Sequence, residues 1–535
     1  MGSLASWSAR ILAGIALSAA VGCTGGDEPR FHEGTPRLLA PDDAVPLSRQ
    51  LKVRLDRPAR IEVAISDSRG ERILKFDQEK RRHLVPLLDL RAGDNVSVVV
   101  TAIDARGSAE SPPVEFRTGS VPDRFPIIDV LAHDPAMAEP GLLLFSIEVV
   151  SDDESLSYLV ALDDSRQPVW IWEPPNEFSD FRLHESGVMY GISRELMWAF
   201  TPLGEVLNQW GATASDDGSE TYVAVDLEEP HHELYPLPHA QRFLTLAPEF
   251  ITVDEFPCTA ANPTASCGPA EIKDMRVIQF NRDGEILQDW LMSERVDPFR
   301  IGFNSLDVLP TGAYDWAHAN AVIPRPGGGL LVSLRHQDAL VALDTDGEVD
   351  WILADPAGWA PRFEPLLLAP VTDDLQWPYH QHGPAYAADG SLWIFDNGNE
   401  GATPYTARTA VDVQSRVVGY RIDESARTVT QIAELKETST GELYSRAMGN
   451  AFLMPTTGNV MGVYATPAKE DGAANGSLGF GRYVARLVEW TTNGELASDV
   501  RLRSERSDEK QGWRTYRATQ APSLYAPGVE TWLDQ

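Results

Sequence analysis

Cysteine, positive charge and long apolar runs are all scarce in this chain. Three of its 535 residues are cysteines, which is too few for a cysteine-based metal site. Lysine and arginine total 45 against 79 aspartates and glutamates, so the formal net charge is -34. Such a chain is repelled by phosphate backbones, which argues against nucleic acid as a partner. The acidic residues are spread rather than gathered in blocks, and we expect them to form a soluble charged surface.

A short apolar run near the N-terminus indicates export. Residues 11 to 21 are apolar, and Arg10 precedes them. The run is too short to span a bilayer and is typical of a signal-peptide core, so residues 1–23 are predicted to be a signal peptide. It ends in AVGC, which resembles a bacterial lipobox and predicts lipid attachment at Cys23; ordinary cleavage beside an incidental cysteine is the alternative. We expect a periplasmic or cell-envelope protein that contacts the membrane only through this anchor.

The other two cysteines lie close together in EFPCTAANPTASCGP. Cys258 and Cys267 enclose a short stretch rich in Pro, Thr and Ser. In an exported protein, an isolated pair of this kind predicts a disulfide bond.

The chain divides into parts of different pattern. Residues 24–36 are polar with Gly and Pro and are predicted to be a tether. Residues 37–120 contain short alternating runs such as LKVRL, RIEVAI and NVSVVVTAI, separated by turn signals such as DSRG. This pattern predicts a small antiparallel β-sandwich. It holds no cluster of chemistry-bearing residues, so we expect a structural or interface role.

Residues 121–535 repeat one pattern, an apolar strand, a turn and a second strand that often ends in Trp. The six copies are LVALDDSRQPVWIW, MWAFTPLGEVLNQW, VIQFNRDGEILQDW, LVALDTDGEVDW, VGYRIDESARTVTQI and LVEWTTNGELASDV. Asp, Asn, Gly and Ser at the turns suit hairpins. If each hairpin is the outer half of a four-stranded blade, the fold class is all-β, with a six-bladed β-propeller after the sandwich. A sandwich of two sheets is the alternative.

Three hairpins that precede these repeats begin with histidine in a similar register. They start at His232 (HELYPLP), His318 (HANAVIP) and His382 (HGPAYAA), with Pro or Ala six residues later. Because the innermost strand of a propeller blade lines the central channel, we expect the three imidazoles to converge at one mouth of it. Whether His231 or His232 faces the channel stays open, although the register favours His232. His380 is expected to face away.

Two polar residues accompany His318. Asn320 lies two residues on, on the same side of the strand, and Arg335 lies in the adjacent strand of the hairpin. Three histidines can bind a transition metal, but a neighbouring arginine repels the cation. Alternatively, imidazoles and Arg335 can hold an oxyanion such as a sulfuryl or phosphoryl group, with one neutral imidazole as nucleophile. Arg335 favours the oxyanion site over the metal site. Each histidine could also be an ordinary strand-end residue.

At these motifs the chain resembles the bacterial arylsulfate sulfotransferase family. The resemblance is carried by DWAHANAV…SLRHQ, HHEL…LP and HQHGP…WIFDNGN, and by an exported chain with a sandwich before a propeller. It implies transfer of a sulfuryl group from a phenolic sulfate ester to a phenolic acceptor, by a ping-pong route through a sulfohistidine. It also implies no nucleotide sulfate donor and no cofactor, and the chain shows no Gly-rich phosphate loop.

The resemblance also implies roles for the residues of these motifs. His382 matches the nucleophile. His318, Asn320 and Arg335 match the residues that hold the sulfuryl oxygens. His232 matches the remaining active-site histidine, which could give a proton to the leaving phenolate and take one from the acceptor.

Two other functions remain open at this point. One is a non-catalytic surface propeller that binds a ligand or a partner, since a fold does not fix function. The other is a metal-dependent hydrolase with the histidines as ligands. Trp316, Trp377 and Tyr379 are candidates for contact with phenols by proximity alone. A homodimer is also compatible with the sequence.

Overall fold

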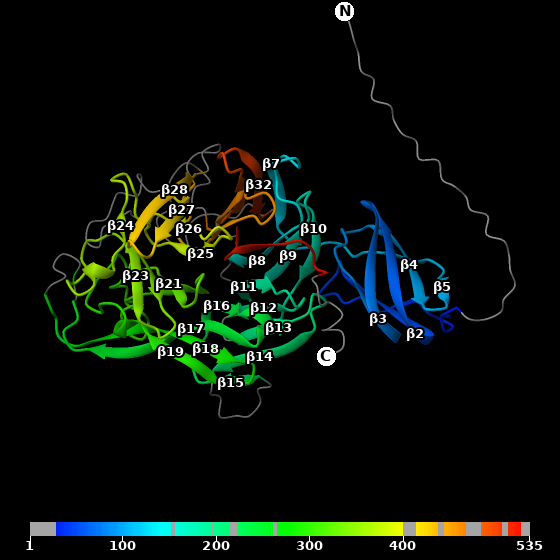
Figure 1. Ribbon diagram of the computed structural model, residues 1–535, viewed down its shortest axis with the longest axis horizontal. Helices are drawn as coiled ribbons and strands as arrows, with labels where there is room; N and C mark the ends of the chain where they lie inside the picture. Colours follow the sequence, from blue (N-terminus) through cyan, green and yellow to red (C-terminus); the bar gives the residue numbers. More distant parts are fainter. Residues whose placement is uncertain are drawn as a thin grey trace, which may run out of the picture.

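The computed structural model is an all-β protein (Figure 1). It describes residues 28–150, 156–193, 196–212, 222–257, 259, 265–399, 414–436, 443–466, 483–504 and 512–525. In these ranges the strands form seven sheets, joined by loops with three short 3-10 turns, η1 (Pro238–Ala240), η2 (Met292–Glu294) and η3 (Glu364–Leu366). No helix found there is long and apolar enough to cross a membrane.

The first sheet is formed by the N-terminal region alone. Its strands are β1 (Arg37–Leu38), β2 (Arg49–Asp67), β3 (Gly70–Leu87), β4 (Asn95–Asp104), β5 (Gly107–Glu110) and β6 (Val114–Arg117), hydrogen-bonded into one sheet. LKVRL and RIEVAI, which the sequence suggests as separate strands, are parts of the single strand β2. The β2–β3 pairing is irregular between Arg54 and Ile61, where Pro58 lacks an N–H to donate. Alternate residues of β2 are buried, as expected for a strand with one core face.

Six further sheets hold four or five strands each. The first three contain β8 (Leu142–Val150), β9 (Ser157–Leu162), β10 (Pro168–Trp172), β33 (Gly512–Arg514) and β34 (Ala518–Ala521); β11 (Phe178–Leu183), β12 (Met189–Ser193), β13 (Leu196–Phe200), β14 (Val206–Ala212) and β15 (Val223–Val225); and β16 (His231–Pro236), β17 (Arg242–Val253), β18 (Ala270–Asn281) and β19 (Ile286–Leu291).

The last three sheets follow the same plan. They contain β20 (Ala319–Pro324), β21 (Leu330–Leu334), β22 (Ala339–Leu343) and β23 (Val349–Ala354); β24 (Ala369–Pro370), β25 (His382–Tyr386), β26 (Leu392–Asp396), β27 (Arg416–Asp423) and β28 (Thr428–Leu435); and β29 (Ala451–Leu453), β30 (Val460–Tyr464), β31 (Ala485–Trp490), β32 (Leu496–Arg503) and β7 (Ile127–His133).

The six predicted repeat hairpins are confirmed. They are the antiparallel pairs β9–β10, β13–β14, β18–β19, β22–β23, β27–β28 and β31–β32, one in each of the six sheets. Most of their terminal tryptophans are core residues. Trp172, Trp210 and Trp351 are at most 2% exposed, which explains why large apolar residues recur at this position, whereas Trp290 is only partly buried.

Strands from both ends of residues 121–535 complete two of the sheets. β7 pairs with β32, and β33 and β34 pair with β8. The first strands of successive sheets, β8, β11, β16, β20, β25 and β29, contact one another in that order. The six sheets therefore follow each other in space as they do in the sequence.

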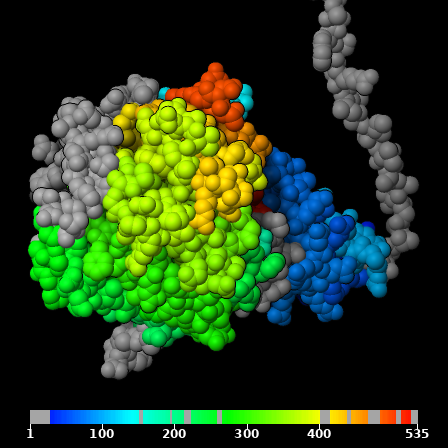
Figure 2. Space-filling model, turned by 60° about the vertical axis from the view of Figure 1, so that its left-hand side comes forward, coloured from blue at the N-terminus to red at the C-terminus, as the bar shows by residue number. Residues whose placement is uncertain are grey.

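The N-terminal sheet packs against the side of this larger body (Figures 1 and 2). Arg91 donates two hydrogen bonds to Asp163, at 2.8 and 2.6 Å. The Tyr525 hydroxyl accepts a hydrogen bond from the Leu88 backbone N–H at 2.6 Å. These contacts tie the N-terminal sheet to the first of the six sheets and to the C-terminal segment.

Candidate active site

The three predicted histidines lie at the beginnings of adjacent strands. His232 is the second residue of β16, His318 directly precedes β20, and His382 is the first residue of β25. The ring centroids of His232 and His318 are 5.3 Å apart. His382 is close enough to His232 and His318 for their charges to interact. The structure therefore brings the three imidazoles together.

The backbone at these strand ends is irregular. Pairing shifts between His231 and Leu234, between Ala319 and Ala321, and between His382 and Ala385. His232 and His318 have φ angles of 64° and 46°, in the left-handed region that side chains other than glycine rarely adopt. Such strained residues cluster at functional sites.

A glycine is required next to His382. Gly383 has a φ angle of 49°, and a Cβ at this position would lie 2.2 Å from the Cβ of Asn450. The Gly of the QHG motif therefore allows the strand carrying His382 to approach the next inner strand closely.

Hydrogen bonds fix which nitrogen of His382 carries the proton. Nδ1 lies 3.0 Å from the His380 carbonyl oxygen and 2.7 Å from Oδ1 of Asn397. Asn397 donates its Nδ2 hydrogens to the carbonyls of Ser445 and Met448, so its oxygen must face His382. Both partners of Nδ1 are acceptors, and Nδ1 is therefore the donor. This leaves the lone pair on Nε2.

The environment keeps His382 neutral. Burial, reinforced by the positive charge of Arg335, holds the pKa of His382 well below its ordinary value. The ring is therefore unprotonated at neutral pH, as a nucleophile must be.

Two arginines supply positive charge beside the histidines. Burial and the nearby Arg446 lower the pKa of Arg335 to about 10, so it is still charged at neutral pH. Arg335 donates through Nη1 to Nε2 of His336 at 2.6 Å, and its buried Nε has no partner in the described structure. No ion pair joins Arg335 or Arg446 to a carboxylate of the described ranges. Two neighbouring cations without a bound carboxylate suit an anionic ligand.

Asp315, His318 and His336 form the cluster in which a metal ion could be considered. One ligand atom from each lies within 4.8 Å of the others. However, Nε2 of His336 accepts from Arg335, so its Nδ1 carries a proton and donates to the Asp315 carbonyl at 2.6 Å. Both nitrogens of His336 are thus engaged, and an arginine is in direct contact. This donor set does not fit a cation.

Asp315 instead serves as the partner of His318. Nδ1 of His318 lies 2.5 Å from Oδ2 of Asp315, which can only accept when ionised. Burial alone would raise the pKa of Asp315, but the charge of His318 and its hydrogen bond bring it well below the ordinary value. The carboxylate therefore orients the ring and places its Nδ1–H, leaving Nε2 for other contacts.

His231 and His232 form a second pair. Their Nδ1 atoms are 2.6 Å apart, so one donates to the other. Burial lowers the pKa of both well below the ordinary value, and each further positive neighbour adds to the effect. The two rings line a cavity of about 200 Å³ together with Met448 and Tyr516. Both histidines face this cavity, so the sequence question of which one points inward has no single answer.

Asn320 is held between two backbone segments. It is fully buried, and its Nδ2 donates to the Gln381 carbonyl, next to His382, at 2.8 Å. The Asn320 carbonyl accepts from Arg517 at 2.6 Å and from the Tyr516 hydroxyl at 3.2 Å. Only one Nδ2 hydrogen is used, so the second is free to meet a ligand.

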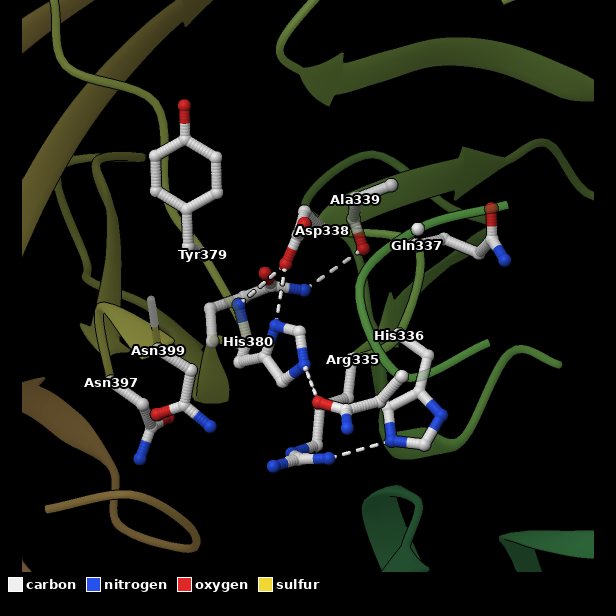
Figure 3. A network of polar contacts seen from close by, with 12 residues as sticks. Arg335, His336, Gln337, Asp338, Ala339, Tyr379, His380, Asn397 and Asn399 are labelled. Atoms are coloured by element: carbon white, nitrogen blue, oxygen red, sulfur yellow. Dashed lines mark hydrogen bonds and ion pairs between the residues drawn. The ribbon is translucent and has the colours of Figure 1, made fainter. Parts of the chain in front are cut away.

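His380, expected from the sequence to face away, belongs to the support of the site (Figure 3). Its backbone N–H and its Nδ1 both lie within hydrogen-bond distance of one Asp338 oxygen, at 2.7 and 2.8 Å, and Nε2 lies 3.0 Å from Oδ1 of Asn304. The ring is fully buried. Because the His380 carbonyl contacts Nδ1 of His382, this anchoring helps to orient the His382 ring.

Of the three aromatic candidates for substrate contact, Trp316 is excluded. It is fully buried in the core, and its indole N–H donates to the Arg300 carbonyl at 3.0 Å. Tyr379 is 8% exposed and its hydroxyl donates to Asp355. Trp377 packs at the edge of another core cluster. Tyr516, which the sequence did not single out, lies nearer, with its ring centroid 5.9 Å from that of His232.

Most of the supporting residues stand inside the motifs that the sequence offered. Asp315 begins DWAH, His336 follows Arg335 in SLRHQ, and Asn397 follows Asp396 in WIFDNGN. Nothing in those motifs states that Asn397 returns to His382, because this contact depends on the pairing of β25 with β26. Arg446 lies outside these motifs, in the loop before β29, where its position in the segment SRAMGNAFL suggests that it could point inward.

Curated relatives match parts of the chain. Arylsulfate sulfotransferase AssT of Escherichia coli O6:H1 is 31% identical over 169 residues, covering 28% of this chain and 26% of the relative. Arylsulfate sulfotransferase AssT of Lelliottia amnigena is 25% identical over 228 residues, covering 34% and 36%. The aligned stretches thus span about a quarter to a third of these relatives.

Solved structures give only weak likenesses. A Bacteroides caccae protein of unknown function is 10% identical, with a TM-score of 0.40 over 71% of this chain and 98% of that one. Virginiamycin B lyase from Staphylococcus aureus is 9% identical, with a TM-score of 0.30 over 73% and 99%. The Arylsulfotransferase (ASST) family, by contrast, matches residues 130–514, which include every histidine described above, and the chain belongs to this family.

Proposed function

We propose that this protein transfers a sulfuryl group from a phenolic sulfate ester to a phenolic acceptor, with His382 as the covalent carrier. The observation that carries the proposal is the state of His382. Its Nδ1–H is held by two acceptors, its Nε2 lone pair is available, and Arg335 lies nearby with Arg446 beside it, neither of them in an ion pair with a carboxylate of the described ranges. A neutral nucleophile beside unpaired positive charge is what attack on an anionic sulfate ester needs. Membership of the family supports the same reaction class.

In the first half-reaction, Nε2 of His382 attacks the sulfur of the donor. An N–S bond forms, the ester S–O bond breaks, and the phenol oxygen leaves with the bonding electrons. Little covalent work falls to the protein, by analogy with phosphoryl transfer, so positioning and charge stabilisation dominate. Arg335, the second Nδ2 hydrogen of Asn320 and the Nε2–H of His318 in its protonated form, paired with Asp315, are assigned to the sulfuryl oxygens.

In the second half-reaction, the acceptor oxygen attacks the same sulfur, and the N–S bond breaks. We assign the proton transfers to His232, through its Nε2. It gives a proton to the departing phenolate, and later takes one from the acceptor phenol. The low pKa of His232 keeps the ring neutral at rest, which suits the base role in the second half-reaction; to act as the acid in the first, the ring must take up a proton from solvent as the donor reacts. Because the two Nδ1 atoms are in contact, the His231 and His232 rings can share this proton.

We also propose the architecture and location that the sequence suggests. Six consecutive sheets whose first strands contact one another in order support a six-bladed propeller of residues 121–535. The self-contained core of the N-terminal sheet supports a separate domain of residues 37–120 with a sandwich-like fold. Export, and lipid attachment at Cys23, rest on the sequence, because residues 1–27 lie outside the described ranges.

The direct test is turnover of a chromogenic aryl sulfate with and without an added phenol. We expect continuous release of the chromophore only when the phenol is present, together with a sulfated acceptor. His382→Asn should abolish the reaction. His239→Asn, at an exposed histidine, is the matched control and should leave the rate unchanged. If no aryl sulfate is turned over with any phenol, the chain is instead a binding protein built on this fold.

A further inference from the structure

The N-terminal sheet carries a groove whose charge is opposite to that of the whole protein. The groove has a volume of about 710 Å³ and is lined by His32, Glu33, Gly34, Thr35, Leu55 and five basic side chains, Arg37, Lys52, Arg54, Arg81 and Arg82. We call these five residues the basic groove. The chain as a whole has a net charge of -34. The groove is lined by five cationic side chains and a single carboxylate, that of Glu33, so its local charge is opposite in sign to that of the whole chain.

The strand register places like charges directly opposite each other in this groove. Arg37 of β1 is the cross-strand partner of Lys52 of β2. Arg54 of β2 is the cross-strand partner of Arg82 of β3. Lys52 and Arg54 are two residues apart on one strand, so they share a face of the sheet. Like charges directly opposite each other destabilise a sheet, so this arrangement costs folding free energy unless an anion bridges the pairs.

The five cations are not neutralised by carboxylates of the residues that the structure describes. None of them forms an ion pair with a carboxylate in the described ranges, whereas the nearby Arg57 pairs with Asp56. Arg37, Arg54, Arg81 and Arg82 are exposed, and Lys52 is half-buried. Their charges are therefore available to an outside partner. Guanidinium groups hold phosphate oxygens through paired N–H donors, and several of them in one groove suit a surface with many phosphates.

The groove also lies at the point where the described chain begins. His32 and Glu33 form part of its wall. His32 is nine residues after Cys23, and a chain of that length spans at most about 30 Å when extended. A lipid chain on Cys23 would thus hold the groove within reach of a bilayer surface.

We propose that the basic groove docks the N-terminal sheet onto an anionic lipid surface, with the headgroup phosphates bridging the like-charged pairs. Each basic side chain near such a surface strengthens binding by about fivefold, and the effect is screened by salt. The proposal does not depend on the reaction at His382.

The test uses the full chain carrying Cys23→Ser, which removes the acyl chain, with vesicles of phosphatidylcholine alone or with phosphatidylglycerol added. Sedimentation should show stronger binding to the anionic vesicles, lost at high salt. Arg54→Gln/Arg82→Gln should weaken the anionic-over-neutral preference by about 25-fold. Lys75→Gln/Arg421→Gln changes the net charge equally at exposed residues outside the groove, and should change the preference less than twofold.

A thermal melt distinguishes loss of binding from loss of stability. Because Arg54→Gln/Arg82→Gln removes a like-charged pair, it should not lower the unfolding temperature. Equal binding to neutral and anionic vesicles would overturn the proposal, as would an equal loss in both double variants. Inorganic phosphate at matched ionic strength should not displace the protein from vesicles. If it does so fully, the groove is a site for free phosphate and not for a lipid surface.

Discussion

Asn397→Asp is the substitution that tests most closely how the contact between Asn397 and His382 keeps the nucleophile neutral. In the wild type the neutral Asn397 oxygen accepts from Nδ1 of His382 at 2.7 Å. A carboxylate in the same place would still accept this hydrogen bond, so the Nε2 lone pair should remain. The substitution adds charge, and an ionised carboxylate stabilises the protonated imidazole; it also removes the two hydrogen bonds that Nδ2 of Asn397 donates to the Ser445 and Met448 carbonyls.

The size and sign of the effect follow from electrostatics. In the wild type, burial and Arg335 keep the pKa of His382 well below its ordinary value, so the nucleophile stays neutral down to low pH. A carboxylate in contact raises the pKa of an imidazole by about 1 to 3, at about 1.4 kcal/mol for each pH unit. The acid limb of the rate profile should therefore move to higher pH by that amount, and activity above it should be retained.

The assay is the initial rate of donor cleavage against pH, in the presence of saturating phenol. Asn399→Asp is the matched control, because Asn399 is equally buried but accepts from the Tyr444 hydroxyl rather than from His382. It should leave the acid limb in place. If Asn397→Asp and the wild type share the same acid limb, Asn397 does not set the state of the nucleophile, and the reasoning from the hydrogen bonds fails.

Three further predictions concern the rest of the molecule. Arg335→Lys keeps the charge but loses the planar fork, so turnover should fall roughly tenfold or more, equivalent to about 1.4 kcal/mol. The control Arg421→Lys should have no effect, and equal rates in Arg335→Lys and the wild type would make Arg335 a structural residue. Cys258→Ser/Cys267→Ser should lower the unfolding free energy by about 2 to 3 kcal/mol in chemical denaturation and spare the activity, and a folded but inactive protein would contradict this. Cys23→Ala should release the protein from the membrane fraction, and unchanged extraction would refute lipid attachment.

The disulfide remains a prediction in its pairing. Cys267 is disulfide-bonded, but Cys258 lies outside the described ranges. The segments on either side are paired, since Pro257 forms an antiparallel bridge with Ser266 and the Cys267 N–H donates to the Phe256 carbonyl. Thiol labelling of denatured, unreduced protein should find neither Cys258 nor Cys267 free.

The sequence predicted those features that have a local physical signature. Turn residues such as Asp-Gly in LVALDTDGEVDW can only be read as a hairpin between two apolar runs, and all six hairpins form. The histidines could be predicted as a group because each marks the start of a first strand, and such starts meet in a repeat architecture. His382 stood out because its QHG motif resembles that of the family's nucleophile, and the structure adds that Gly383 is needed for the close approach to Asn450.

The features that escaped the sequence depend on pairing between distant segments. The joining of β7 to β32 and of β34 to β8 links strands over 350 residues apart, and neither end carries a matching local pattern. Asp338 supports His380 from another sheet, and the place of His380 before the strand, on which the prediction that it faces away rested, gave no sign of this contact. Trp316 was taken for a substrate contact because it lies near His318 in sequence, but its side chain points into the core.

The central claim is that His382 carries the sulfuryl group, and mapping of the donor-loaded protein tests it most directly. Donor alone, without acceptor, should release one phenol per protein molecule and leave an acid-labile group on Nε2 of His382, which disappears when phenol is added. His382→Asn should fold but show neither the burst nor the label, and His232→Asn should load more slowly at the same position. A label on His232 or His318, or steady turnover with no label at all, would contradict the account.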